Sequence, residues 1–391
     1  MIELLTALLW LIVMPLALLV LIFSLEVWLG IGRTKSVEYT GQVPETCILI
    51  PAHDEARGIV QTLERLRPAI SETIRVLVVA DNCTDETTAL VREQGFEVVE
   101  RFNAKDRGKG FALAFGRDYL RAAPPQCVIV IDADCYSDAR SVADLARCAC
   151  HARSAVQARN VLEPTQAGSA KVQVSSFAFW IKNVVRQRGT YRAGGGAILT
   201  GTGMAFPWEV FDRIPLATGS IVEDLSLSVD LIRSGESPCY LEQATVYSAP
   251  ASEEATIGQR SRWEQGFLTV SLSHALPLFG YGLISLDRKA ILLGLHLLVP
   301  PMTLLMAICG LIAAILGGVT IFTGDWLPFA VLVASLVAAL SGVLLNWALE
   351  GHLWLTPRAL AALPLYLLWK LPMYSRLLAG KRVGWVRTKR D

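Results

Sequence analysis

Two aspartates one residue apart, Asp132 and Asp134, are the residues of this chain best placed to do chemistry. They follow residues 128–131, four β-branched apolar residues that predict a strand buried on both faces, as in a parallel sheet. Open α/β sheets bind ligands at the carboxyl ends of their strands. Hard divalent ions on a diphosphate use one or two carboxylates, so the pair indicates a metal–nucleotide site. A solvated loop after a core strand is the alternative interpretation.

Two more predicted strands end in acidic residues. Residues 46–50 form an apolar run that leads into the sequence PAHDE at 51–55, and residues 75–80 lead into Asp81. Each acid taken alone is also typical of a turn or a helix cap. Three acidic strand ends in one sheet favour a shared site at its carboxyl edge.

Helical patterns separate these strands. Apolar residues recur at helical spacing in 59–66, a capped helix is expected at 86–94, and another at 109–120, with a third strand at 96–100. Strands that alternate with helices in this way predict a doubly wound parallel sheet, which belongs to the α/β class.

A basic, glycine-bearing turn at residues 105–110 opens the helix that carries Lys109. Backbone N–H groups and cations at a helix start suit a pyrophosphate, so Lys109 is a candidate donor contact. An ordinary solvated loop is the alternative interpretation.

A glycine-rich stretch spans residues 193–203 and includes Gly201 and Thr202. Glycine lets the backbone approach a flat ligand such as a sugar ring, so Gly201 and Thr202 are candidate acceptor contacts. The spacing does not match a phosphate-binding loop of ATPases. A flexible linker is the alternative, but the apolar residues 197–199 and 204–206 predict burial.

Glu223 and Asp224 stand at the start of a predicted helix. Acids there complement the helix dipole, and they are equally suited to act as a general base toward an acceptor hydroxyl. Further on, Gln259, Arg262 and Trp263 share one helical face at i, i+3 and i+4. An arginine can hold a leaving diphosphate and a tryptophan can stack on a sugar. An amphipathic helix lying on a membrane is the alternative, and both can hold at once.

The composition bounds the class of protein. The 391 residues are 53% hydrophobic and 18% charged, and the formal net charge is +1, which gives no indication of a nucleic-acid partner. The eight cysteines form no CxxC pair, and we expect them to be reduced thiols.

The apolar excess lies in membrane-length segments at the two ends. Residues 4–25 carry no charge and lack a basic start, which predicts an uncleaved anchor. Residues 290–324, kinked at a double proline, and residues 327–348 predict two more spans. Residues 358–378 hold three interruptions and are expected to lie on the membrane surface, with a further span as the alternative. Basic residues after the first span place the hydrophilic middle region in the cytoplasm, at the inner membrane.

Six motifs occur in order: PAHDE (51–55), ADNCTD (80–85), RGKG (107–110), DAD (132–134), VED (222–224) and QRSRW (259–263). The set resembles the processive-type, membrane-embedded family 2 glycosyltransferases, which include cellulose, chitin and hyaluronan synthases and bacterial exopolysaccharide glycosyltransferases. The resemblance implies a GT-A (Rossmann-like) fold flanked by transmembrane and interfacial helices. It also implies a nucleotide-diphosphate sugar donor, usually UDP-linked, a Mg²⁺ or Mn²⁺ ion, and inversion at the anomeric carbon.

The resemblance also implies a role for each matching residue. Asp224 would be the base, with Glu223 beside it, and a carboxylate near a diphosphate is expected to have a raised pKa. Asp132 and Asp134 would hold the metal, and Trp263 the acceptor. The implied donor contacts are Pro51, His53, Glu55, Asp81, Lys109, Asp132, Gln259 and Arg262.

The expected domain order follows from these segments. It comprises a transmembrane helix at 1–30, a cytoplasmic catalytic domain at 40–250, interfacial helices at 251–286, two transmembrane helices at 287–349, and an interfacial or fourth transmembrane helix with a basic tail at 350–391. The spans are fewer than in the large synthases. Transfer of one sugar to a lipid or glycan acceptor is therefore weighed against processive synthesis coupled to export. A non-catalytic, nucleotide-sugar-binding membrane subunit is the alternative of another class.

Overall fold

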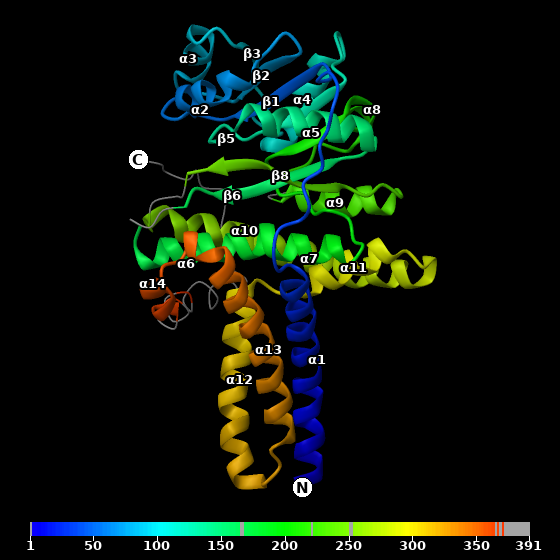
Figure 1. Ribbon diagram of the computed structural model, residues 1–391, viewed down its shortest axis with the longest axis vertical. Coiled ribbons are helices and arrows are strands. Elements are labelled where there is room, and N and C mark those ends of the chain that lie inside the picture. The colour runs from blue at the N-terminus through cyan, green and yellow to red at the C-terminus, as the bar shows by residue number, and fades with distance from the viewer. Residues whose placement is uncertain are drawn as a thin grey trace. The chain divides into compact units, whose positions relative to one another are not determined.

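A computed structural model describes residues 2–164, 168–219, 222–249, 253–363, 366 and 370. The chain forms two compact units (Figure 1). The sheet unit consists of Thr34–Glu163 and Gly195–Pro250, and the helical unit consists of Met1–Arg33, Pro164–Gly194 and Ala251–Asp391. Residues 164–194 lie within the segment expected to form the catalytic domain, yet they group with the helical unit.

The sheet unit is built on an eight-stranded sheet of order β3-β2-β1-β4-β7-β6-β8-β5. The first four strands in this order are parallel. The other half is mixed, because β7 runs antiparallel to both β4 and β6, and β5 runs antiparallel to β8. The strands are β1 (Thr46–Ala52), β2 (Ile74–Asp81), β3 (Glu97–Arg101), β4 (Cys127–Val130), β5 (Cys135–Ser137), β6 (Val156–Leu162), β7 (Met204–Pro207) and β8 (Cys239–Ser248).

The predicted parallel sheet is confirmed for the four strands that the sequence indicated, β1 to β4. The other four strands, which the sequence did not indicate, make the rest of the sheet mixed. The chain leaves the sheet unit after β6 and re-enters it before β7, which then lies beside β4 in the opposite direction. A pattern of buried apolar runs does not distinguish the two directions, since both kinds of strand are buried here on both faces.

Two layers of helices cover the sheet. Side chains alternate across β1, so that Ile48 joins one apolar core and Leu49 the other. Helices α2 and α5 pack on the first face, and α4, α8 and α9 on the second. The helices of this unit are α2 (Ile59–Leu66), α3 (Thr87–Glu93), α4 (Lys109–Leu120), α5 (Ala139–Ala152), α8 (Trp208–Arg213) and α9 (Glu223–Arg233).

The helical unit contains four helices that, among the described residues, are long and apolar enough to cross a membrane: Ala7–Leu29, Arg262–Ser285, Met302–Thr323 and Leu327–Leu349. Helices α1, α12 and α13 run along the long axis of Figure 1, and α10 and α11 run across it. The helices of this unit are α1 (Ile2–Leu29), α6 (Ala170–Trp180), a π-helix (Ile181–Arg186), α7 (Gln187–Arg192), α10 (Glu253–Ser285), α11 (Arg288–Leu298), α12 (Met302–Thr323), α13 (Leu327–Leu349) and α14 (Pro357–Ala361).

The single kinked span expected at 290–324 is wrong. Helix α11 ends at Leu298 and α12 begins at Met302, so the double proline at 300–301 separates two helices. Helix α11 folds back on α10, where Gly282 and Gly294 allow close backbone contact. The stretch expected to lie on the membrane surface, 358–378, falls mostly outside the described residues.

A buried polar network ties α1 to the helices that cross it. Arg186 Nε donates to Glu26 Oε2 at 2.5 Å, and His296 Nδ1 lies 2.8 Å from Glu26 Oε1. Arg188 binds Glu350 of the α13 end through two hydrogen bonds of 2.8 and 3.0 Å. Because these charges are paired, they can be buried among the apolar helices.

Candidate active site

The predicted Asp132–Asp134 pair lies at the carboxyl end of β4, in a tight turn between β4 and β5. The turn is fixed by its backbone: the Cys135 N–H donates to the Asp132 carbonyl at 2.9 Å, and the Thr62 hydroxyl donates to the Ala133 carbonyl at 2.8 Å. The intervening Ala133 is buried and both carboxylates are partly exposed. The turn therefore presents both acids at the sheet edge where parallel strands end.

Lys109 connects this turn to a second and a third motif. Its Nζ lies 2.5 Å from Asp132 Oδ1 and donates to the Gly201 carbonyl at 2.6 Å. Gly201 has φ +85°, and a Cβ there would lie 3.3 Å from Asp224 Oδ2. Thr202 Oγ1 accepts the Asp132 N–H at 3.1 Å. We call Lys109, Asp132, Gly201 and Asp224 the Lys109 junction, and it joins residues that are more than 90 positions apart in the chain.

The electrostatics of the junction follow from its two acids and from the adjacent Glu223. Burial works against the charge on Lys109, but Asp132, Glu223 and Asp224 outweigh it and raise the pKa of the ammonium group. Burial also raises the pKa of Glu223 to about 7, with Lys109 opposing and Asp224 supporting the rise. The sequence hypothesis placed a raised pKa on Asp224, and the structure gives one to its neighbour Glu223.

Asp132, Asp134 and Cys135 have ligand atoms within 4.8 Å of one another, and we call them the Asp132 cluster. Burial and the two nearby carboxylates raise the pKa of the Cys135 thiol well above its usual range. A protonated thiol does not bind a hard cation, whereas carboxylate oxygens suit Mg²⁺ and Mn²⁺. Asp132 and Asp134 therefore fit a divalent cation, and Cys135 does not.

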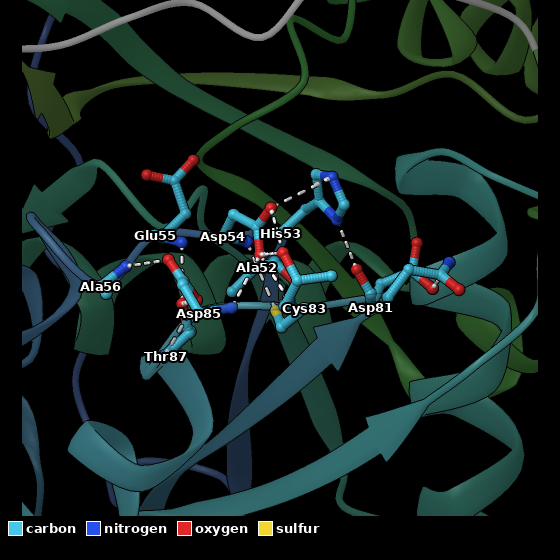
Figure 2. Close-up of polar contacts among 11 residues, drawn as sticks. Ala52, His53, Asp54, Glu55, Ala56, Asp81, Cys83, Asp85 and Thr87 are labelled. Atoms are coloured by element: carbon cyan, nitrogen blue, oxygen red, sulfur yellow. Dashed lines mark hydrogen bonds and ion pairs between the residues drawn. The ribbon is translucent and has the colours of Figure 1, made fainter.

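A second acid–thiol group, the Asp54 cluster, consists of Asp54, Cys83 and Asp85, with ligand atoms also within 4.8 Å. Figure 2 shows that Asp54 and Asp85 each form hydrogen bonds with the loop that carries the other. Asp54 Oδ1 accepts the Thr84 N–H at 2.6 Å and the Asp85 N–H at 3.2 Å. Asp85 accepts the Ala56 N–H at 3.1 Å and the first N–H of α3 at 3.0 Å. These acids hold two loops together.

Asp81 ends β2 and is buried with an ion-pair partner. Arg101, at the end of the adjacent β3, donates to Asp81 Oδ1 at 2.6 Å. His53 Nδ1 lies 2.7 Å from the Asp81 carbonyl oxygen, which can only accept, so Nδ1 carries the proton (Figure 2). The Asp81 side chain thus shares the carboxyl edge of the parallel strands with the Asp132 cluster.

The other predicted donor contacts divide between the two units. Pro51 lies within β1, paired with Val79, and the Glu55 N–H donates to the Thr87 hydroxyl at 2.8 Å. Arg262 and Trp263 lie on α10 in the helical unit, where the Trp263 ring packs against Phe179 at 5.6 Å. The Gln259 backbone belongs to α10, and its side chain lies outside the described residues.

Sequence reasoning missed Arg101. The available signal was a basic residue at the end of a predicted strand that runs beside the strand ending in Asp81. Because β2 and β3 are parallel and pair Asp81 with Arg101 in register, the two side chains meet. A single-sequence pattern shows the two ends but not their register.

Comparisons with known proteins found similar solved structures. A mannosyltransferase of Pyrobaculum calidifontis, solved with GDP-mannose and Mn²⁺, is 18% identical, with a TM-score of 0.54; the match covers 90% of this chain and all of that one. Glucosyl-3-phosphoglycerate synthase of Mycobacterium tuberculosis, solved with Mn²⁺, UDP and phosphoglyceric acid, is also 18% identical, with a TM-score of 0.40 and coverage of 59% and 84%. No curated protein matches the chain.

The predicted GT-A fold is confirmed by the shared architecture. The model of the family described as "Glycosyltransferase like family 2" matches residues 44–266, which include all six motifs. With more than half of its length matched, the chain belongs to the glycosyltransferase-like family 2.

Proposed function

We propose that this protein transfers a sugar from a nucleotide-diphosphate donor to an acceptor hydroxyl, with inversion, in the synthesis of a membrane-associated glycan or glycolipid. The position of Lys109 is the observation that supports this proposal. Lys109 contacts Asp132 directly and lies beside Asp224, so a candidate metal ligand and a candidate base meet around one cation. The Mn²⁺ bound by the Pyrobaculum enzyme and by the Mycobacterium enzyme makes Mn²⁺ or Mg²⁺ the proposed cofactor.

Asp132 and Asp134 would hold the divalent cation, which supplies positive charge at the leaving diphosphate. Lys109 adds a second positive charge at the same place, preorganised by the Gly201 carbonyl and by Asp132. Asp224 takes the acceptor proton as the hydroxyl attacks the anomeric carbon from the face opposite the diphosphate. Arg262 and Trp263 are proposed contacts of the diphosphate and the acceptor.

We propose that the chain works at the inner membrane with the sheet unit in the cytoplasm, where nucleotide sugars are available. Arg33 and Lys35 directly follow α1, whereas the connection between α12 and α13 carries Asp325 and no basic residue. This asymmetry favours a cytoplasmic location for the region after α1.

The test is turnover of a panel of UDP- and GDP-sugars by the full chain in detergent with Mn²⁺, followed by mass analysis of lipid-linked and soluble products. Asp224→Asn should lower transfer about 10³-fold while donor binding persists, because general-base catalysis typically contributes that much. Asp230→Asn, an exposed acid on the same helix, is the matched control and should leave transfer unchanged.

Unchanged turnover in Asp224→Asn would remove Asp224 from the mechanism. Donor binding without any product in the unaltered protein would favour a non-catalytic subunit. The number of sugars per acceptor separates single addition from processive synthesis.

A further inference from the structure

Gln157 is a buried glutamine near the start of β6, and both ends of its side chain bind the glycine-rich stretch. Its Oε1 accepts the Thr200 N–H at 2.9 Å, and its Nε2 donates to the Thr202 carbonyl at 2.9 Å. Nε2 also donates to the Ala158 carbonyl at 2.9 Å. These partners fix the orientation of the amide, because its oxygen meets an N–H and its nitrogen meets two carbonyls. Gln157 therefore binds backbone groups on both sides of Gly201.

Asn160, three residues further along β6, binds the same part of the backbone. Its Nδ2 donates to the Thr200 carbonyl at 3.2 Å and to the Thr200 hydroxyl at 3.1 Å. On a regular strand, residues three apart point to opposite faces of the sheet. Here the pairing of β6 with β8 shifts register between residues 158 and 159, and the amides of Gln157 and Asn160 both reach Thr200. Such irregularities re-aim side chains, and they are frequent beside active sites.

The strands on both sides also bind this stretch. The Gly203 N–H donates to the Val130 carbonyl of β4 at 2.9 Å, and the Gly203 carbonyl accepts the Ala158 N–H of β6 at 2.8 Å. A Cβ at Gly203 would lie 2.8 Å from the Val246 side chain, so the backbone is closely enclosed there. Gly201 has a φ of +85°, which L side chains rarely adopt. The backbone thus takes an unusual path, and its neighbours hold it in place.

Two groups of this stretch face the Lys109 junction. The Gly201 carbonyl accepts a hydrogen bond from Lys109 Nζ at 2.6 Å, and Thr202 Oγ1 accepts the Asp132 N–H at 3.1 Å. Hydrogen bonds weaken steeply when their geometry is distorted, so the orientation of the Gly201 carbonyl helps to set the position of Lys109 Nζ. A positive charge stabilises a leaving group best when it is in place before the reaction. A side chain that fixes this carbonyl therefore acts on the charge of the junction.

We infer that Gln157, assisted by Asn160, is a positioning residue for sugar transfer, which fixes the Gly201 carbonyl and thereby places Lys109 at the leaving diphosphate. The inference rests on the proposed function, because it takes Lys109 as the cation that meets the diphosphate. A buried amide that served only the fold would affect transfer to the same extent with or without Lys109. The two roles therefore differ in whether the effects of substituting Gln157 and Lys109 are additive.

The test is a double-mutant cycle on the full chain in detergent with Mn²⁺, using a nucleotide sugar that the unaltered protein transfers. Gln157→Met keeps the size of the side chain and removes its hydrogen bonds. Transfer should fall about tenfold, because a 1 Å misplacement of a catalytic group costs up to about 10²-fold and the remaining contacts of the stretch limit the shift. In a Lys109→Met background the same substitution should change transfer less than about twofold, because the group that Gln157 positions is gone. Rates at saturating donor and metal compare the four proteins.

Thr46→Val is the matched control, because Thr46 is also buried and its hydroxyl also donates to a backbone carbonyl, that of Pro44, at 2.7 Å. That contact lies at the start of β1, at the opposite end of the strand from the carboxyl edge. Thr46→Val should lower the melting temperature and leave the rate unchanged in both backgrounds. Gln157→Glu should restore most of the lost rate, because burial keeps its carboxyl protonated and able both to accept and to donate.

An equal fall in rate on Gln157→Met with and without Lys109 would overturn the inference, and so would full activity of a folded Gln157→Met protein. Either result leaves the proposed function standing. If Gln157→Met does not fold, Asn160→Leu takes its place in the cycle and must show the same dependence on Lys109. Absence of transfer by the unaltered protein with every sugar of the panel would overturn the proposed function, and the inference with it.

Discussion

The Asp54 cluster and the Asp132 cluster have the same composition, two aspartates and a cysteine, and the same compactness. They differ in what the carboxylate oxygens already accept. Backbone N–H groups from two loops bind the acids of the Asp54 cluster. In the Asp132 cluster the turn is held by main-chain carbonyls instead, and one acid faces Lys109. The acids of the Asp54 cluster therefore hold two loops together, whereas the Asp132 cluster is the proposed site for the cation.

The largest predicted effect is a loss of transfer activity, with a changed Mn²⁺ dependence, that should occur for the Asp132 cluster and not for the Asp54 cluster. Asp134→Asn removes a carboxylate proposed to hold the cation, and transfer should fall at least about 10²-fold, with the Mn²⁺ concentration for half activity raised. Asp85→Asn should leave that Mn²⁺ concentration unchanged, because Asp85 binds backbone groups. Steady-state rates across a Mn²⁺ titration measure both. If the Mn²⁺ concentration for half activity rose equally in both variants, the two clusters would not differ in metal dependence.

The second prediction concerns Lys109, which contacts Asp132 of the Asp132 cluster. Lys109→Met should lower transfer about 10²-fold, because it removes a preorganised positive charge from the diphosphate region. Lys105→Met, an exposed lysine in the same turn, is the matched control and should retain activity. Rates at saturating donor and metal make the comparison. Full activity of Lys109→Met would mean that Lys109 only offsets the charge of the neighbouring acids.

The contrast between the clusters also shows what the sequence could predict. Apolar runs predicted strands at 75–80 and 128–131 and a helix at 109–120, which the structure has as Ile74–Asp81, Cys127–Val130 and Lys109–Leu120. The meeting of Lys109, Asp132 and Asp224 was implied by the family resemblance and not by the strand pattern. A loop role for Asp54 was one of the two interpretations that the sequence left open, and its main-chain N–H partners carry no sequence signal that chooses between them. The Asp81–Arg101 pair depends on register, which local patterns do not give.

The third prediction concerns Glu223, beside the Lys109 junction, whose pKa is raised by burial. The folded-state pKa of Glu223 is raised to about 7, so between its ordinary pKa and pH 7 the folded protein holds a proton that the unfolded chain has lost. The free energy of unfolding should therefore fall as the pH rises through this range, by about 2–3 kcal/mol. Melting in detergent at pH 5 and pH 8 measures it. Glu223→Gln should flatten the dependence, and an unchanged slope would assign it to another group.

The smallest predicted effects are changes in the free energy of unfolding, and substitutions in the two clusters should change it in different directions. Asp85→Asn leaves one of its bound N–H groups without an acceptor, which should lower the free energy of unfolding by about 1–2 kcal/mol. Asp134→Asn instead removes one of two carboxylates whose oxygens lie within 4.8 Å, and relief of their repulsion should keep or raise stability. Thermal melting of both variants in detergent without added metal compares them directly. Removing an acid that holds two loops together should cost stability, whereas removing Asp134 relieves its repulsion with Asp132. A loss of stability in Asp134→Asn as large as that in Asp85→Asn would show that both clusters serve the fold.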